Sequence, residues 1–186
     1  MKLEKLEYEI VGVGRGLMTH NPSQMTATQT GATIGKKKIP TPEEEADRGV
    51  YRDEKGIYLP AVAFQRAMIR ACSGKKVGKT SAKSVVSGAV LIVQEKCYLV
   101  DPRTKKPLTK WEVDIRRVVV QGRDAIMRSR PLFPVWATRV SFEINTDYVA
   151  PAALDPIMTE AGIMVGVGDY RPEHTGPFGR FEAKRI

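Results

Sequence analysis

The order of the elements predicted from the sequence indicates an α+β fold. Residues 5–10 alternate charged and apolar side chains, which is the two-residue period of a half-buried strand. A helical pattern follows at 57–72, and then come several extended segments, a second helical pattern at 150–161 and a short closing strand. This order favours one antiparallel sheet with helices on one face. We therefore expect a ferredoxin-like (RRM-like) fold in a single domain spanning residues 1–186.

The extended segments between the two helices are predicted to pair as antiparallel strands. Residues 111–121 have the pattern of a strand, in which Val113 and Ile115 are expected to point inward. Residues 121–124 resemble a hairpin turn, and the segment 135–145 alternates strongly again. These segments are expected to add strands to the sheet.

The first helix is the clearest of the predicted elements. It is expected over 57–72, because Pro60 suits a first helical turn and Gly74 lies just beyond the end. The second helix is expected over 150–161 with Gly162 as its stop signal. The apolar stripe that should bury the first helix consists of Phe64, Ala67, Met68 and Ala71.

A long segment between the first strand and the first helix has no sustained periodicity. We expect residues 17–56 to form a projecting arm, since structureless loops of this length are uncommon in compact domains. Within this arm, Thr41 followed by Pro42 indicates the start of one short helix. The run Lys36, Lys37 and Lys38 places positive charge on the arm.

The composition indicates a polyanionic partner. Thirty Lys and Arg residues against 21 Asp and Glu give a formal charge of +9, and cations that neutralise phosphates release condensed counterions. Acidic proteins and anionic lipid also fit this charge, but no basic amphipathic helix supports lipid binding, and nucleic acid is the favoured partner. No apolar run approaches the roughly 20 residues that a membrane helix needs. Cys72 and Cys97 alone provide no disulfide framework, so we expect a cytoplasmic protein without membrane contact.

Several common catalytic motifs are excluded by their spacing. The glycines at 12–16 do not open a helix, so they do not form a dinucleotide-binding loop. The segment 73–79 follows a helix and has the wrong glycine spacing for a nucleotide phosphate loop. His20 and His174 stand apart from other metal ligands, so we expect no metal and no cofactor. The catalytic option left open is metal-free RNA cleavage with a histidine as general base.

Arginine, glycine and aromatic residues are concentrated near the C-terminus. The segment 162–181 holds five glycines, two arginines, one histidine and three aromatic residues. Glycine permits close backbone approach, arginine binds phosphate, and aromatic rings stack on bases. Together with the basic residues of the arm and the first helix, this segment predicts a single-strand-binding groove. The expected contact residues are Lys36, Lys37, Lys38, Arg66, Arg70, Lys75, Lys76, Tyr170, Arg171, His174, Phe178 and Arg180.

Three stretches resemble the RAMP superfamily, specifically the subunits that coat guide RNA in CRISPR effector complexes. Ile57-Tyr-Leu-Pro60 before a helix resembles the start of that family's first helix, and the excursion 17–56 resembles its projecting thumb. The segments 166–171 and 176–181 resemble its C-terminal glycine-rich loop and the strand that follows it. The chain departs from the family at 61–63, where Ala-Val-Ala replaces the usual Gly-Ser-Ser.

The resemblance implies a non-enzymatic RNA-binding protein that oligomerises along single-stranded guide-type RNA. Other effector subunits and a role in antiviral defence would be part of that function. Three alternatives stay open: a viral single-stranded DNA-binding protein, a RAMP-type metal-independent endoribonuclease, and a phage structural assembly protein.

Overall fold

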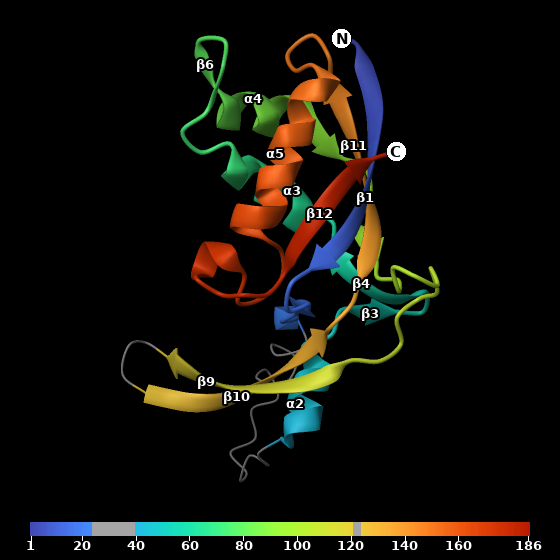
Figure 1. The fold of residues 1–186 in the computed structure, drawn as a ribbon, viewed down its shortest axis with the longest axis vertical. Coiled ribbons are helices and arrows are strands. Elements are labelled where there is room, and N and C mark those ends of the chain that lie inside the picture. The colour runs from blue at the N-terminus through green and yellow to red at the C-terminus, as the bar shows by residue number, and fades with distance from the viewer. Residues whose placement is uncertain (24–39, 121–123) are drawn as a thin grey trace.

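The computed structural model describes residues 1–23, 40–120 and 124–186 (Figure 1). Within these ranges the chain is a mixed α+β protein with antiparallel sheets and four α-helices. The main sheet has the strand order β12-β1-β11-β7, and each neighbouring pair is antiparallel. Its strands are β1 (Leu3–Val13), β7 (Val90–Ile92), β11 (Ala137–Asn145) and β12 (Arg180–Arg185).

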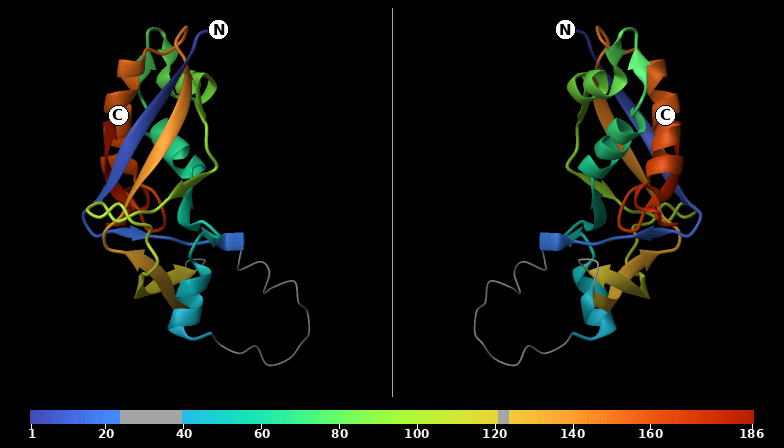
Figure 2. Two further views of the ribbon diagram at one scale, coloured as in Figure 1. Left: turned by 90° about the vertical axis from the view of Figure 1, so that its right-hand side faces the viewer. Right: turned by 90° about the vertical axis from the view of Figure 1, so that its left-hand side faces the viewer.

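One face of the main sheet forms the core. Leu6, Tyr8 and Ile10 of β1 are buried, as their alternation predicts. Helices α3 (Val62–Ala71) and α5 (Leu154–Glu160) lie on this side of the sheet, and their apolar residues join the same cluster (Figures 1 and 2). The opposite face of the sheet carries mostly charged side chains.

The first helix begins later than the sequence pattern predicts. The stripe of Phe64, Ala67, Met68 and Ala71 is buried as expected. However, the preceding residues form the strand β4 (Gly56–Pro60), which pairs with β8 (Lys96–Tyr98). The earlier start was wrong because the buried residues at 57 and 59 follow a two-residue period, which belongs to a strand.

The second helix continues past its expected stop. A short 3-10 turn at Pro151–Ala153 leads into α5, and a π-helical turn extends it over Ala161–Val165. Gly162 does not end the helix. Its lack of a side chain instead lets the helix pack closely against β12. A Cβ at Gly162 would lie 2.0 Å from the carbonyl oxygen of Phe181 on β12. Helix α4 (Ala82–Ala89) was not predicted from the sequence.

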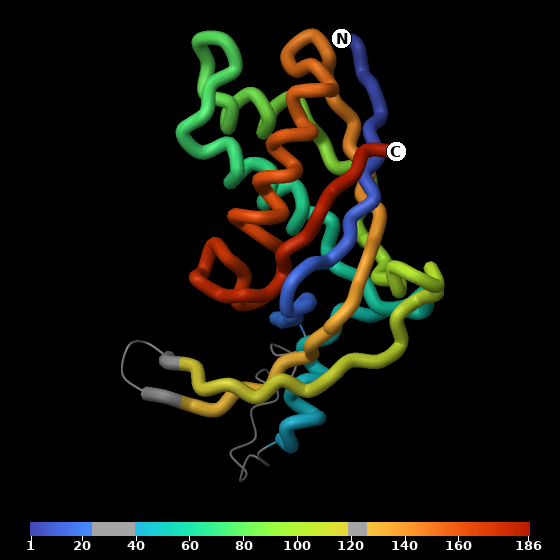
Figure 3. The backbone as a smooth tube through the Cα atoms, in the orientation of Figure 1, coloured from blue at the N-terminus to red at the C-terminus, as the bar shows by residue number. Residues whose placement is uncertain are grey.

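A second sheet extends away from the main body (Figure 3). It has the order β2-β10-β9, with β9 and β10 forming a hairpin. Val113 and Ile115 were expected to point inward, and this was wrong: they are 37% and 49% exposed. The hairpin leaves the core, so alternation along it does not mark a buried face. The strands are β2 (Leu17–Met18), β9 (Glu112–Val120) and β10 (Asp124–Phe133).

The described parts of the predicted arm contact this hairpin. Strand β2 pairs with β10, and helix α2 (Pro42–Arg48) packs against β10. Thr41 caps α2 through a reciprocal contact with Glu44, which confirms the predicted helix start. Lys36, Lys37 and Lys38 lie outside the described residues, so their expected contacts stay a prediction.

Three short strands and one 3-10 turn complete the described part of the fold. Strand β3 (Arg52–Asp53) pairs with β4, and β5 (Lys76–Val77) pairs with β6 (Thr80–Ser81). A 3-10 turn at Pro172–His174 lies in the C-terminal glycine-rich segment. Across the described ranges, no helix has both the length and the apolar character required to cross a membrane.

Candidate nucleic-acid interface

The glycine-rich loop at 166–179 lies between the helical part of the fold and the hairpin. Gly168 adopts a φ of +81°, and a Cβ at this position would lie 2.3 Å from the carbonyl oxygen of Met18 on β2. The following backbone N–H, of Asp169, donates to the same carbonyl oxygen at 2.8 Å. Only glycine permits both this φ and this close approach. The loop is therefore docked directly on the base of the second sheet.

Arg171 stabilises the shape of this loop. Its Nη1 donates to the carbonyl oxygen of Gly168 at 2.9 Å, and its Nη2 donates to Glu173 Oε2 at 2.7 Å. Glu173 also pairs with Arg70 Nη1 of α3 at 3.2 Å, through its other oxygen. One carboxylate thus connects α3 to the loop.

A first cleft lies between α3 and the glycine-rich loop, and we call it the α3 cleft. Its cavity of about 610 Å³ is lined by Arg66 and Arg70 from the helix and by Arg171 and Glu173 from the loop. These three arginines were predicted from sequence as contact residues, and the fold brings them together. Tyr51, which follows α2, also lines this cleft.

His20 lies on the wall of the α3 cleft. Burial lowers the pKa of its imidazole, and the nearby charge of Arg130 adds to this effect. Tyr51 Oη donates to the carbonyl oxygen of His20 at 2.9 Å, which fixes the backbone. Nδ1 of the ring is buried without a hydrogen-bond partner among the described residues. This lowered pKa favours the neutral form of the imidazole at neutral pH, beside the arginines of the cleft.

A second cleft lies between the hairpin and the glycine-rich loop, and we call it the hairpin cleft. Its cavity of about 500 Å³ is lined by four arginines and two aspartates, with apolar surface from Met18 and Val118. The register of the hairpin places Arg116 directly opposite Arg128. The charged lining residues are Arg116, Arg117, Arg128, Arg130, Asp114 and Asp169.

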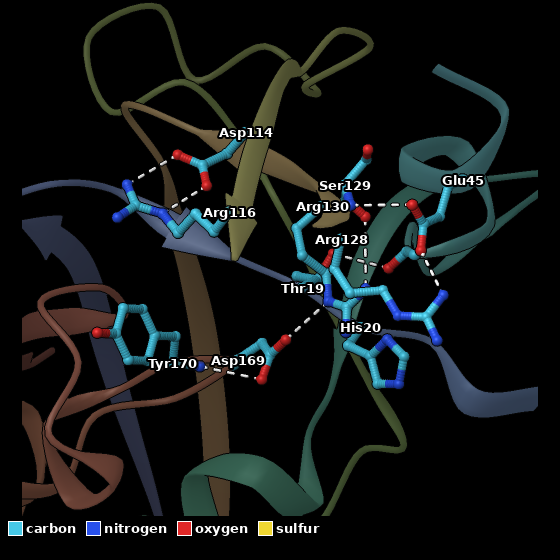
Figure 4. Close-up of polar contacts among 12 residues, drawn as sticks. Thr19, His20, Glu45, Asp114, Arg116, Arg128, Ser129, Arg130, Asp169 and Tyr170 are labelled. Carbon is cyan, nitrogen blue, oxygen red and sulfur yellow. Dashed lines mark hydrogen bonds and ion pairs between the residues drawn. The ribbon is translucent and has the colours of Figure 1, made fainter. Parts of the chain in front are cut away.

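Three arginines of the hairpin cleft are paired with carboxylates (Figure 4). Arg116 Nε and Nη2 donate to the two carboxylate oxygens of Asp114 at 2.5 and 2.9 Å, and these hydrogen bonds raise the pKa of the guanidinium. Arg128 Nη1 lies 3.0 Å from Glu45 Oε1 of α2. Arg130 Nε donates to Asp169 Oδ2 of the loop at 2.9 Å. The hairpin is thus bound to both α2 and the loop by ion pairs.

Tyr170 is the exposed aromatic residue at the hairpin cleft. It is 42% exposed and has a φ of +48°, in the left-handed region where a bulky residue is uncommon. Its ring lies 6.2 Å from that of Phe178, which is only 1% exposed. Arg116 covers the Phe178 ring at 4.8 Å. Of the two aromatics predicted to approach a base, Tyr170 therefore presents accessible surface and Phe178 supports it.

Four other predicted contact residues that lie within the described ranges line neither cleft. Lys75 pairs with Glu160, and Lys76 is exposed on β5. His174 is exposed beside Glu173. Arg180 pairs in register with a residue of β1 and points to the charged face of the main sheet.

Sequence reasoning missed most of the hairpin cleft. The sequence places Arg128 and Arg130 on a strand and Arg116 on the outward side of the strand predicted over 111–121, but the expected contact residues include neither these nor Arg117. The signal in the sequence that could have indicated this cleft is the presence of arginines on both β9 and β10, which are adjacent in the chain. Within the described ranges, no group of three or more His, Cys, Asp or Glu side chains is arranged to hold a metal ion. Comparison with protein-family models and with curated proteins finds no match for this chain.

Proposed function

We propose that this protein is a non-enzymatic RNA-binding protein that holds single-stranded RNA by its phosphates. The observation that carries this proposal is the convergence of arginines from α3, the hairpin and the glycine-rich loop on two adjoining cavities. Guanidinium groups match phosphate geometry, and several phosphates in series are what a polynucleotide offers. The arginines concerned are Arg66, Arg70, Arg116, Arg117, Arg128, Arg130 and Arg171.

A ferredoxin-like core and a relationship to the RAMP superfamily belong to the same proposal. Two observations support the ferredoxin-like interpretation. The main elements follow one another along the chain as β1-α3-β7-β11-α5-β12, and the strands lie in the sheet in the order β12-β1-β11-β7. The placement of the glycine-rich loop against α3 supports the resemblance to subunits that coat guide RNA. In that role the protein would work in the cytoplasm, alone or with other effector subunits.

The charged face of the main sheet is poorly suited to bind bases. Glu7, Glu9 and Glu143 lie on it, and the aromatic residues of these strands, Tyr8 and Phe142, are buried on the other face. These carboxylates offset the basic residues of the same face, and no aromatic side chain of β1 or β11 is exposed there for stacking. We therefore place the RNA in the two clefts, with a base stacked on Tyr170.

Oligomerisation along the RNA is supported by the exposed apolar surface of the hairpin. Val113, Ile115 and Met127 are all exposed. Apolar residues gathered on a projecting element are suited to packing against a neighbouring protomer. Each protomer would then cover a few nucleotides of a longer strand.

Binding of a labelled 30-mer RNA, followed by fluorescence anisotropy at several salt concentrations, tests the proposed function. We expect affinity to fall steeply with salt, and a DNA 30-mer of equal sequence to bind more weakly. Affinity that stays flat with salt would exclude binding through phosphates. Equal or tighter binding of DNA would favour the single-stranded DNA-binding alternative, and ordered particles formed without nucleic acid would favour a structural assembly protein.

A metal-independent endoribonuclease is the second candidate, and the position of His20 favours it. A neutral imidazole in an arginine-lined cleft can accept the proton of a ribose 2′-hydroxyl. Incubation of labelled hairpin RNA with excess EDTA tests this candidate. Discrete cleavage that is lost in His20→Ala and kept in His174→Ala would support it, and intact RNA would exclude it.

A further inference from the structure

The α3 cleft and the hairpin cleft meet at one side chain. Asp169 lines both cavities. Its carboxylate accepts a hydrogen bond from Arg130 Nε at 2.9 Å and another from the backbone N–H of Tyr170 at 3.0 Å. Figure 4 shows the carboxylate between these two donors. An RNA strand that occupies both clefts must therefore cross this ion pair.

The donors around the Asp169 carboxylate are those of an anion site. A guanidinium and a backbone N–H from a residue with positive φ are a combination that binds phosphate oxygens. The Arg130 side chain is only 15% exposed, so its charge is held in place, whereas the Asp169 side chain is 38% exposed and has room to turn outward. The backbone of Asp169 is fixed independently, because its N–H donates to the Met18 carbonyl oxygen.

We propose that the junction of the two clefts is a phosphate site for the bound strand, which the Asp169 carboxylate occupies in the free protein. This proposal rests on the proposed function and adds the point at which the strand crosses between the clefts. On binding, one phosphodiester takes the place of the carboxylate, and Arg130 and the Tyr170 N–H exchange one anion for another. Asp169 then sets the affinity by competing with RNA for Arg130.

Removal of the Asp169 charge should consequently strengthen RNA binding. Asp169→Asn keeps the shape of the side chain and an oxygen that accepts from Arg130, but it competes less with phosphate. We expect the dissociation constant for the RNA 30-mer to fall by about three- to tenfold at 0.1 M KCl. Asp147→Asn is the matched control, because it removes the same charge from an exposed residue that lies outside both clefts.

A double variant separates the local effect from general electrostatics. In an Arg130→Gln background, Asp169→Asn should give no gain beyond that of Asp147→Asn, since the site has lost its cation. Asp169→Glu, which keeps the charge, should bind like the wild type and shows whether the loop tolerates substitution. Thermal melting of each variant establishes that it is folded under the assay conditions.

The outcomes distinguish the two proposals. A gain in Asp169→Asn that exceeds the Asp147→Asn gain and disappears with Arg130→Gln supports the phosphate site. Equal gains in Asp169→Asn and Asp147→Asn, or a gain that persists without Arg130, would overturn it while leaving RNA binding intact. Absence of RNA binding by the wild-type protein would overturn the proposed function, and the phosphate site with it.

Discussion

Loss of the hairpin arginines should change the salt dependence of RNA binding by a calculable amount. Each phosphate neutralised on a single strand contributes about −0.7 to the slope of log K against log salt. Arg171 is left out of this calculation, because its guanidinium is held within the loop by the Gly168 carbonyl and Glu173. If the other six arginines of the two clefts each neutralise one phosphate, the wild-type slope is about −4. Replacing Arg116, Arg117 and Arg128 with glutamine should halve it to about −2.

These slopes predict clearly different affinities. Between 50 and 200 mM KCl, a slope of about −4 corresponds to a loss of roughly 250-fold, whereas a slope of about −2 corresponds to roughly 16-fold. Fluorescence anisotropy titrations at four or five salt concentrations resolve this difference. The measurement reports ion release, so it separates phosphate contacts from uncharged contacts that also alter affinity.

A matched triple variant controls for net charge. Arg103, Lys106 and Lys110 are exposed and line neither cleft. Their replacement with glutamine removes the same three charges and should leave the slope near the wild-type value. If the hairpin variant and this control share one slope, the hairpin arginines do not contact phosphates, and the assignment of the hairpin cleft is refuted. Thermal melting is needed for the hairpin variant, because Arg128 also pairs with Glu45.

Three further predictions concern stability and reactivity. Phe64→Ala should cost about 3–5 kcal/mol of unfolding free energy in urea, because the buried ring packs on Phe181; a loss below about 1 kcal/mol would contradict this packing. Burial raises the pKa of Cys97 to about 12, so native protein at pH 8 should leave this thiol unlabelled until urea unfolds it. The hydrogen bond from Lys96 lowers the pKa of Asp53 from 3.8 to about 2, so the ionised carboxylate stabilises the fold above about pH 4 and this contribution is lost as pH falls toward 2. Asp53→Asn should flatten the dependence of the urea midpoint on pH in that window, and an unchanged dependence would contradict the shift.

The parts of the fold that face the core could be predicted from the sequence. The alternation in β1 and the stripe on α3 report burial directly, since each apolar side chain there packs on the sheet or the helices. The same kind of alternation did not indicate burial in the hairpin, where the chain leaves the core. Val113 and Ile115 alternate as buried residues do, yet nothing in the local pattern shows that the hairpin extends past the body.

The candidate site was predictable only in part, for a related reason. Arg66 and Arg70 share a helix face, and the glycine-rich loop has a distinctive composition, so the α3 cleft could be inferred. The hairpin cleft depends on a strand register that places Arg116 opposite Arg128, and register is a tertiary property. Pairing is also invisible in sequence: Arg171 is engaged by Glu173 within the loop.

The pairing of these arginines bears on what the clefts can bind. Arg70, Arg116, Arg128 and Arg130 each contact a carboxylate, so a phosphate gains only the difference between two anionic partners. For one phosphate this difference is small, because the phosphate only replaces a carboxylate that the guanidinium already contacts. A polynucleotide offers several phosphates on one chain, and after the first contact the others act at high effective concentration. The carboxylates should therefore discriminate against mononucleotides and free phosphate, so that only a strand long enough to span both clefts binds tightly.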